Sequence, residues 1–470
     1  MGLSELAARV SAREVSAREM VEEAFDRIER LDVDLHSVVA LREEASDDAR
    51  SLDDALAAGA QAGSLAGLPV LVKDVTDVAG MRTTFGSRWF ADAPVAEADG
   101  LVPARLRSAG AIVVGKTNTP EFATEGYTSN LLFGTTGNPW RRDASPGGSS
   151  GGSAAALAAG LVPIATAADG GGSVRIPAAW CGLVGLKPTN GVSGRDRVPD
   201  WIDFSTDGPL ATSVADVRLL LDVMAGPVAG DPTALPGPLP NAPARPARLF
   251  AIERWADWGP LAPELTGLFE RALARMQEVL GVTAERVDAR QLFGDANIDD
   301  DWFAIAGAEH AHHLGGERIE EHGHELHPAT RGFLEDGLKV PFERYLAARR
   351  RRFGYVRALD ELLGDDALIC SPVMAMTSCP ADGVMPGADT PGLPTDAYVT
   401  QAQNMTGHPA ISVPAGRAVD GVPFGLQVTG PRFLDRLVLD VAESWERAEP
   451  WPLVADGYSP FDPTGGSDGH

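Results

Sequence analysis

Apolar residues recur at helical spacing along the first sixty positions of this chain. The apolar positions within residues 3–10 and 21–28 are three or four apart, which predicts two helices between residues 4 and 31. Ser16 lies three positions before Glu19, as in a capping box at the start of the second helix. A third helix is predicted over about residues 43–58. None of these segments carries a pattern typical of a reaction, so we interpret residues 1–60 as a supporting helical layer.

Short apolar runs with tight polar or glycine boundaries follow, and these predict buried strands. They span residues 67–72, 111–114, 161–166, 247–252, 282–287, 366–370, 409–413 and 424–428. Helical patterns alternate with them at residues 101–108, 153–159, 213–226, 263–280, 301–314, 338–363 and 435–447. The alternation predicts an α/β fold with a central mixed, mostly parallel β-sheet covered by helices on both faces. The proline-rich stretch 227–246 predicts a long surface connection, and the polar tail after Pro450 is expected to be loosely ordered.

Two glycine-flanked serines lie in one stretch of the sequence, residues 145–189. Ser149 is part of GGSSGG, and Ser173 ends DGGGS. Glycine lets a ligand approach the main chain closely, and consecutive N–H groups in such a loop can converge on one point, as an oxyanion hole requires. The hydroxyl of Ser173 would lie beside those donors. Two tight turns with solvated serines fit each loop equally well, so neither loop alone decides between these alternatives.

Lys73 ends the apolar run GLPVLV and is followed by Asp74. A lysine at the end of a strand ordinarily extends its amine into solvent. If Lys73 stays inside, burial lowers its pKa, and the neutral amine can accept a proton from a serine hydroxyl. Asp74 would then point to the opposite face, because successive strand residues alternate.

Two alternatives to a site built from serine and lysine have to be considered: an α/β-hydrolase nucleophile, and a metal or nucleotide site. The segment 147–151 matches the GxSxG pattern of α/β-hydrolases, but that pattern needs a strand directly before the serine, and residues 138–146 have the composition of a loop. Six histidines between His310 and His327 match no zinc-binding spacing, and Lys116 lies in no GxxxxGK[ST] loop. We therefore predict a site with no metal and no organic cofactor.

The stretch from Ser145 to Thr189 resembles the signature of the amidase signature enzymes, serine hydrolases that cleave amides with a Ser–cis-Ser–Lys triad. The resemblance continues in GLPVLVKD, GKTNTPEF, GHPAISVPAG and DGVPFGLQVTG, and is weakest between about Pro227 and Leu368. It implies one domain over residues 1–470. Within it we expect a signature core at 61–226, a variable helical lobe near the substrate entrance at about 296–365, and the C-terminal part of the core at 366–450.

The resemblance also implies roles for individual residues. Ser173 would be the nucleophile, Ser149 the proton relay with a cis peptide bond before it, and Lys73 the base. The two serines are 24 positions apart, which equals the spacing in the family's triads.

Residues around Ser173 are given supporting roles. The N–H groups of Gly170, Gly171, Gly172 and Ser173 would form the oxyanion hole. Asp169 and Arg175 flank the loop, and we expect them to form a structural ion pair. The family usually has threonine before this aspartate, whereas the chain has Ala168, a departure that removes no triad group.

The activity implied is hydrolysis of the carbon–nitrogen bond of a small-molecule amide through an acyl-enzyme. Two alternatives stay open: an amidase-fold hydrolase acting mainly on carbamates, esters or cyclic amides, and the catalytic subunit of a tRNA-dependent amidotransferase, which needs a partner subunit. The pocket residues are also open, since a set of aromatic side chains fits either a substrate pocket or an ordinary core. These are Trp180, Trp201, Phe204, Trp302 and Phe303.

Composition limits the partners and the compartment. The formal net charge of −26 disfavours nucleic acid and anionic membranes, whose phosphates would be repelled. The three cysteines show no CxxC spacing, which predicts reduced thiols in a cytoplasmic protein. No apolar run has the length of a signal-peptide core or of a membrane span, so we expect no membrane association. A homodimer is left open.

Overall fold

An eleven-stranded mixed sheet runs through the computed structural model, which describes residues 1–196, 204–240, 245–256 and 259–463. The strand order is β1-β3-β2-β6-β10-β8-β14-β15-β13-β11-β12. The strands are β1 (Val38–Leu41), β2 (Pro69–Lys73), β3 (Ile112–Thr117), β6 (Ile164–Ala165), β8 (Val184–Lys187), β10 (Leu210–Ala211), β11 (Arg248–Ala251), β12 (Ala284–Arg286), β13 (Ala367–Pro372), β14 (Ala410–Arg417) and β15 (Pro423–Thr429). Two small sheets pair β4 (Ser129–Asn130) with β5 (Gly134–Thr135), and β7 (Ala168–Asp169) with β9 (Thr206–Asp207).

Parallel pairing occupies two stretches of the large sheet. β2 pairs in parallel with β3 and with β6, and β11 does so with β12 and with β13. The strands between these stretches, β10, β8, β14 and β15, are joined by antiparallel pairs. The α/β class and the mixed sheet predicted from the sequence are confirmed. The sheet was expected to be mostly parallel, but six of its ten neighbouring pairs are antiparallel, because strands such as β14 and β15 follow each other through a short connection.

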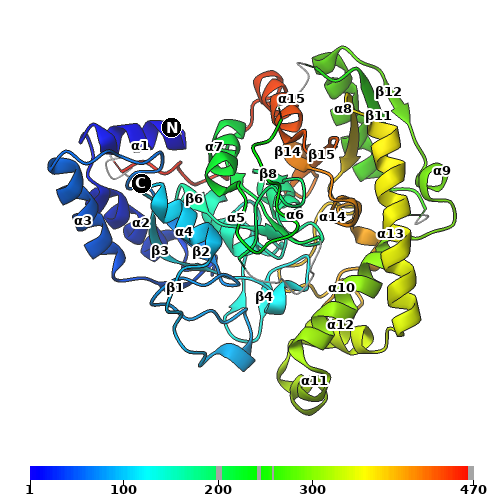
Figure 1. Cartoon of the computed structure of the whole chain (residues 1–470), viewed down its shortest axis with the longest axis horizontal. Helices are drawn as coiled ribbons and strands as arrows, with labels where there is room; N and C mark the ends of the chain where they lie inside the picture. The colour runs from blue at the N-terminus through cyan, green and yellow to red at the C-terminus, as the bar shows by residue number, and fades with distance from the viewer. Residues whose placement is uncertain (197–203, 241–244, 257–258, 464–470) are drawn as a thin grey trace.

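Helices cover both faces of this sheet (Figure 1). Those that belong to the body of the fold are α1 (Leu3–Ser11), α2 (Ala17–Leu31), α3 (Ala45–Ala57), α4 (Leu101–Ser108), α5 (Gly151–Ala158), α6 (Arg175–Cys181), α7 (Val214–Met224), α8 (Pro263–Leu280), α9 (Ala289–Phe293), α14 (Gln401–Thr406) and α15 (Asp435–Ala448). Short 3₁₀ turns lie at η1 (Arg88–Phe90), η2 (Glu121–Ala123), η3 (Gly323–Glu325) and η4 (Thr395–Ala397). The capping box predicted at Ser16 and Glu19 is present at the start of α2.

A helical lobe lies at one end of the sheet, along the right and lower right of Figure 1. It consists of α10 (Ile298–Leu314), α11 (Gly316–His322), α12 (Pro328–Leu338) and α13 (Phe342–Leu363). α10 and α13 correspond to the two helices predicted here, whereas α11 and α12 were not predicted. Trp302 of α10 and Tyr355 of α13 belong to the same buried cluster as Phe250 of β11 and Ile369 of β13, so the lobe shares a core with this end of the sheet.

Two sequence expectations at the edges of elements need correction. The strand predicted at 111–114 continues as β3 through Thr117, because Lys116 is buried and paired with Asp74 rather than solvated in a loop. The tail after Pro450 was expected to be loosely ordered, yet Phe461 is 5% exposed and packs in the main core. The guanidinium of Arg27 lies over the Phe461 ring, 5.4 Å from its centre, which holds this segment against α2.

No helix in the described ranges combines the length and the apolar character needed to cross a membrane.

Candidate active site

Lys73 is the last residue of β2, and its amine points into the protein. The side chain is 2% exposed, and its Nζ donates hydrogen bonds to Ser149 Oγ at 2.6 Å and to Ser150 Oγ at 3.0 Å. Its main-chain N–H is held by Thr166 Oγ1 at 2.9 Å. The structure thus places Lys73 inside, the less ordinary of the two alternatives for a lysine at a strand end.

Ser149 lies in the loop that leads into α5, and the peptide bond between Gly148 and Ser149 is cis. The residues before it form a loop, as predicted, so no strand enters the serine as an α/β-hydrolase elbow requires. Its Oγ contacts a lysine amine rather than an imidazole. The main chains of the two serine loops are joined directly, because Ser150 N–H donates to the Ser173 carbonyl at 3.3 Å.

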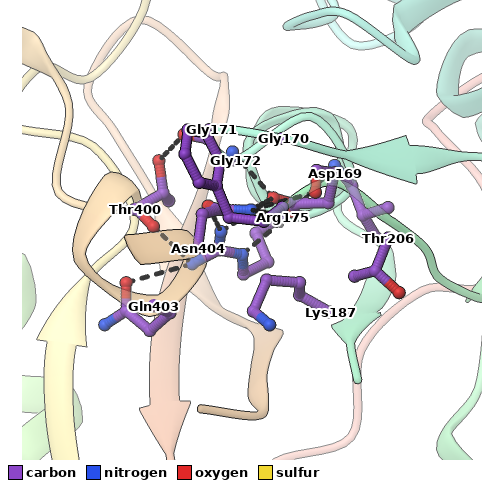
Figure 2. A network of polar contacts seen from close by, with 12 residues as sticks. Asp169, Gly170, Gly171, Gly172, Arg175, Lys187, Thr206, Thr400, Gln403 and Asn404 are labelled. Carbon is purple, nitrogen blue, oxygen red and sulfur yellow. Dashed lines mark hydrogen bonds and ion pairs between the residues drawn. The ribbon is translucent and has the colours of Figure 1, made fainter. Parts of the chain in front are cut away.

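Side chains outside the triple-glycine loop hold it in place by donating hydrogen bonds to its carbonyl groups. Trp302 Nε1 donates to the Gly170 carbonyl at 2.9 Å. Thr400 Oγ1 donates to the Gly171 carbonyl at 2.6 Å (Figure 2). Gly172 has a φ of +129°, and a Cβ there would lie 2.2 Å from Thr400 Oγ1, so only glycine fits this position.

The N–H groups of this loop are not equivalent. Gly172 N–H donates to Asp169 Oδ1 at 2.8 Å and is therefore engaged within the protein. Within the described residues, no hydrogen bond is made by the N–H groups of Gly170, Gly171 or Ser173. The expectation that Gly172 supplies an oxyanion donor conflicts with this contact, because one N–H cannot serve Asp169 and a ligand fully at once.

Asp169 and Arg175 form the predicted ion pair, and both side chains are fully buried. Arg175 Nη2 and Nε reach the two carboxylate oxygens at 2.8 and 3.0 Å, a bidentate contact. Burial alone would raise the pKa of Asp169, but the Arg175 charge and the hydrogen bonds from Arg175 and Asn404 outweigh it and lower that pKa to about 2. Asp169 is therefore charged over the whole working range of pH.

The rest of the guanidinium is satisfied by residues from distant parts of the chain (Figure 2). Its remaining partners are the Thr400 carbonyl at 2.9 Å, Gln403 Oε1 at 3.1 Å, Gln427 Oε1 at 2.7 Å and Asn404 Oδ1 at 2.6 Å. Asn404 Nδ2 also donates to Asp169 Oδ1 at 2.9 Å. Arg175 thus connects the glycine loop to α14 and β15, and the loop takes its shape from the C-terminal part of the sheet.

Two cavities meet at Ser173, which is 8% exposed. The first cavity has a volume of about 310 Å³, and its walls include Gly171, Ile176, Trp302, Phe303, Phe333 and Tyr398. The second cavity has a volume of about 350 Å³ and includes Lys73, Ser149, Gly170, Arg195, Thr206 and Asp207. Ser173 therefore lies between a largely apolar compartment and a more polar one that holds the lysine amine.

Nearby carboxylates offset only part of the effect of burial on the amine of Lys73. Burial lowers the pKa of Lys73 to about 7, and the negative charges of Asp169 and Asp207 oppose part of this shift. Asp74 points the other way, as predicted, and its carboxylate is 3.0 Å from Lys116 Nζ. About half of the lysine is consequently neutral near pH 7.

Of the aromatic residues that could form either a substrate pocket or an ordinary core, some do each. Trp302 and Phe303 line the first cavity. Trp180 and Phe204 are 2% and 0% exposed and belong to the core. Trp201 lies outside the described residues.

The histidine-rich region lies mainly on the surface of the lobe. His312, His313, His322 and His324 are exposed or partly exposed, as predicted, whereas His310 and His327 are buried against aromatic rings. In the part of the chain that the structure describes, no group of three His, Cys, Asp or Glu side chains is arranged to hold a metal ion.

A comparison with known proteins places this geometry in a family. The chain matches the Amidase family over residues 19–439. It belongs to that family. Two relatives match nearly end to end: a Glutamyl-tRNA(Gln) amidotransferase subunit of Chromohalobacter salexigens, 37% identical over 97% of this chain and 98% of its own, and the Acylamidase of Rhodococcus erythropolis, 34% identical over 96% of each.

Solved structures agree with this assignment. A bacterial aryl acylamidase of the amidase signature enzymes superposes with a TM-score of 0.86 at 28% identity, covering 96% of each chain. The 6-aminohexanoate cyclic dimer hydrolase superposes with a TM-score of 0.83 at 27% identity, covering 96% of this chain and 97% of its own. The amidase signature fold and the class of amide-hydrolysing enzymes predicted from the sequence are confirmed.

Several contributors to the site carry little or no signal in the sequence and were not predicted. Ser150 is a second partner of Lys73, and its position directly after Ser149 in GGSSGG was the available signal. Thr400 and Asn404 support the glycine loop from more than 220 positions away, and no local pattern marks them. Glu125 lines the first cavity and follows the GKTNTPEF segment by three positions.

Proposed function

We propose that this chain is an amidase that hydrolyses small-molecule amides through an acyl-enzyme on Ser173, with Ser149 as relay and Lys73 as base. The observation that carries the proposal is the hydrogen bond of 2.6 Å between Lys73 Nζ and Ser149 Oγ, formed by a buried lysine whose pKa is lowered to about 7. A neutral amine at that position is a base near its best working pH.

Acylation follows from this arrangement. Ser173 Oγ attacks the amide carbonyl carbon while its proton passes to Ser149 Oγ, and the proton of Ser149 passes to the neutral amine of Lys73. The tetrahedral intermediate then loses its nitrogen when the C–N bond breaks. The proton returns from Lys73 through Ser149 to the leaving nitrogen, so an amine departs and the acyl group stays on Ser173.

Deacylation uses the same relay in the same order. A water molecule takes the place of the amine, gives its proton through Ser149 to Lys73, and attacks the ester carbonyl. The carboxylic acid leaves when Ser173 Oγ recovers the proton. Apart from the leaving nitrogen and the attacking water, only Lys73, Ser149 and Ser173 gain or lose a proton in this cycle.

Charge on the carbonyl oxygen is stabilised by main-chain donors of the glycine loop. Because Gly172 N–H is engaged by Asp169, we assign this role to the N–H groups of Gly170, Gly171 and Ser173. Loss of one such donor typically costs about 100- to 1000-fold in kcat. The ion pair of Asp169 and Arg175 fixes the loop that presents them.

Small amides are the substrates that the cavities favour. The compartments on either side of Ser173 measure about 310 and 350 Å³, which suits a compact acyl group and a compact amine. The acylamidase and aryl acylamidase relatives are named for substrates of this kind.

We place the enzyme in the cytoplasm, since Cys181, Cys370 and Cys379 are free thiols.

A second candidate function is the catalytic subunit of a tRNA-dependent amidotransferase, favoured by the 37% identity to such a protein over nearly the full length of both chains. It predicts that the purified chain alone has little activity and gains it with a partner protein. Hydrolysis by the isolated chain over a panel of aryl, aliphatic and cyclic amides, carbamates and esters supports the amidase. Stable association with a second protein that raises the activity supports the alternative.

The decisive experiment for the mechanism is covalent labelling. A fluorophosphonate reporter should modify the wild-type enzyme at Ser173, located by peptide mass spectrometry, and Ser173→Ala should neither be labelled nor turn over an amide. Labelling at Ser149 would overturn the assignment and restore the GxSxG alternative.

A further inference from the structure

The first cavity is apolar in its walls but carries acidic groups and no basic ones. Trp302, Phe303 and Phe333 supply aromatic surface, and the carboxyl side chains that line it are Glu125, Asp299, Asp300 and Asp336. Among the described residues, no lysine, arginine or histidine lines this cavity. A ligand held here meets carbon surface and negative charge.

The acidic groups differ in what already neutralises them. Asp336 forms an ion pair with Lys339 at 2.8 Å, and both side chains are largely exposed. Asp299 and Asp300 lie in the first turn of α10, Asp299 buried and Asp300 exposed, where the positive end of the helix dipole stabilises a carboxylate. The carboxyl of Glu125, in contrast, makes no hydrogen bond or ion pair with any described residue, and burial is the cause of its perturbed titration.

Glu125 is held firmly beside the reacting groups. A Cβ added at Gly148 would lie 2.5 Å from the Glu125 carbonyl oxygen, so the backbone of Glu125 packs against the residue that precedes Ser149. A Cβ added at Gly126 would lie 2.9 Å from the Tyr398 hydroxyl, so the next residue is equally confined. The backbone of Glu125 is therefore fixed in the wall of the first cavity, the cavity that Ser173 also lines.

The position of the proton donors in the second cavity indicates which half of a substrate lies in the first cavity, beside Glu125. Lys73 and Ser149, which return the proton to the leaving nitrogen in the proposed mechanism, line only the second cavity. The leaving amine has to be near them to receive that proton, so it faces the second cavity. The acyl portion then occupies the first cavity with Glu125.

We propose that Glu125 binds a protonated amine on the acyl portion of the substrate, so that the preferred substrates are amides of acids that carry a basic nitrogen. This inference rests on the proposed function, because it assumes an acyl group on Ser173. The aromatic walls hold the carbon skeleton, and the carboxylate holds the ammonium in a site of low polarity, where a charge-assisted hydrogen bond is strong.

The raised pKa of Glu125 is consistent with a carboxyl group that lacks a positively charged partner in the free enzyme. Burial raises the pKa of Glu125 to about 8, because no neighbouring positive charge offsets the loss of solvation. An ammonium group brought into the first cavity supplies that charge and favours the carboxylate form.

The test compares three 4-nitroanilides that differ only at the far end of a rigid acyl group: 4-methylbenzoyl, 4-(aminomethyl)benzoyl and 4-carboxybenzoyl. We expect the wild-type enzyme to show a kcat/KM for the ammonium substrate at least about tenfold above that for the methyl substrate, the factor given by one hydrogen bond between charged groups. The carboxylate substrate should be the poorest. In Glu125→Gln the ratio of ammonium to methyl should fall by about tenfold, and in Glu125→Lys the carboxylate substrate should become the best of the three.

Asp336→Asn is the matched control, since Asp336 lines the same cavity but is neutralised by Lys339. Its ratio of ammonium to methyl substrate should equal that of wild type. Equal kcat/KM values for the ammonium and methyl substrates in wild type, or a preference that survives in Glu125→Gln, would overturn the inference while leaving the amidase intact. Hydrolysis that persists in Ser173→Ala would instead contradict the proposed function itself.

Discussion

Lys73 Nζ lies 2.6 Å from Ser149 Oγ, although the two residues are 76 positions apart in the chain. Lys73 ends β2, which pairs in parallel with β6, the strand that follows α5. Because a short turn connects α5 to β6, the helix runs back along the strand and its first residues lie near the strand's carboxyl end. The loop before α5 and the end of β2 therefore meet at one edge of the sheet, where α/β proteins usually bind their ligands.

The first prediction concerns the pH dependence of the reaction. Only the neutral form of Lys73 accepts a proton, and burial lowers its pKa to about 7, so kcat/KM should rise with pH through one ionisation near 7 and then level off. The rate is lost on the acidic side because protonation removes the base. A pH–rate profile of the wild-type enzyme on a neutral amide measures this directly.

Two substitutions at the same position act as controls for this assignment. Lys73→Ala should lose most activity together with the acidic limb of the profile. Lys73→Arg should not restore it, since a guanidinium stays protonated at any pH the protein tolerates. A Lys73→Arg enzyme with substantial activity and an unchanged profile would show that another group is the base.

The three groups of the proposed mechanism could be singled out in the sequence because each lies in a contiguous signal. Ser149 and its neighbour Ser150 lie between two glycine pairs, Ser173 directly follows three glycines, and Lys73 ends an apolar strand. The supports of the loop could not be predicted in this way. Arg175 reaches Asn404 and Gln427 across 229 and 252 positions, and such contacts depend on which strands become neighbours.

The second prediction concerns the buried ion pair. Arg175→Met removes the partner of a fully buried Asp169 and leaves that charge uncompensated, which typically destabilises a protein by about 3–5 kcal/mol. We expect a lower free energy of unfolding in denaturant titrations and a loss of activity, because the glycine loop loses its link to α14. Arg50→Met is the control: Arg50 pairs with Asp47 on the surface, and its loss should cost less than about 1 kcal/mol. Similar costs in both variants would contradict a supporting role for Arg175.

The fold shows the same division between local and distant signals. α4 has the predicted bounds, and β11, α8 and β12 form the predicted parallel unit, because their periodicity lies within one short segment. The antiparallel pairing of β8 with β14 joins residues more than 220 positions apart, and no pattern in either strand specifies its neighbour. Phe461 was assigned to a loose tail for a related reason: one aromatic residue in a polar segment does not reveal the Arg27 that it packs against.

The third prediction is that catalysis does not depend on a metal ion. The proton transfers proposed here use only Lys73, Ser149 and Ser173, and the described histidines of the lobe are not arranged as ligands. Activity should be unchanged after exhaustive dialysis against EDTA, measured as kcat/KM on the same amide. Activity that disappears and returns with zinc would require a role for the histidines between His310 and His327.

The fourth prediction tests whether the shape of the glycine loop limits the rate. A Cβ at Gly172 would lie 2.2 Å from Thr400 Oγ1 at a φ of +129°, so Gly172→Ala has to displace both the loop and the hydroxyl that holds the Gly171 carbonyl. The N–H groups assigned to the oxyanion hole then lose their alignment, and we expect kcat to fall about 100-fold, with a stability loss of about 1–3 kcal/mol. Gly237→Ala is the matched control, since a Cβ there meets no atom within 4 Å and the backbone is not left-handed. A Gly172→Ala enzyme that keeps the wild-type kcat would show that the loop tolerates the shift, and the donors would then have to be sought elsewhere.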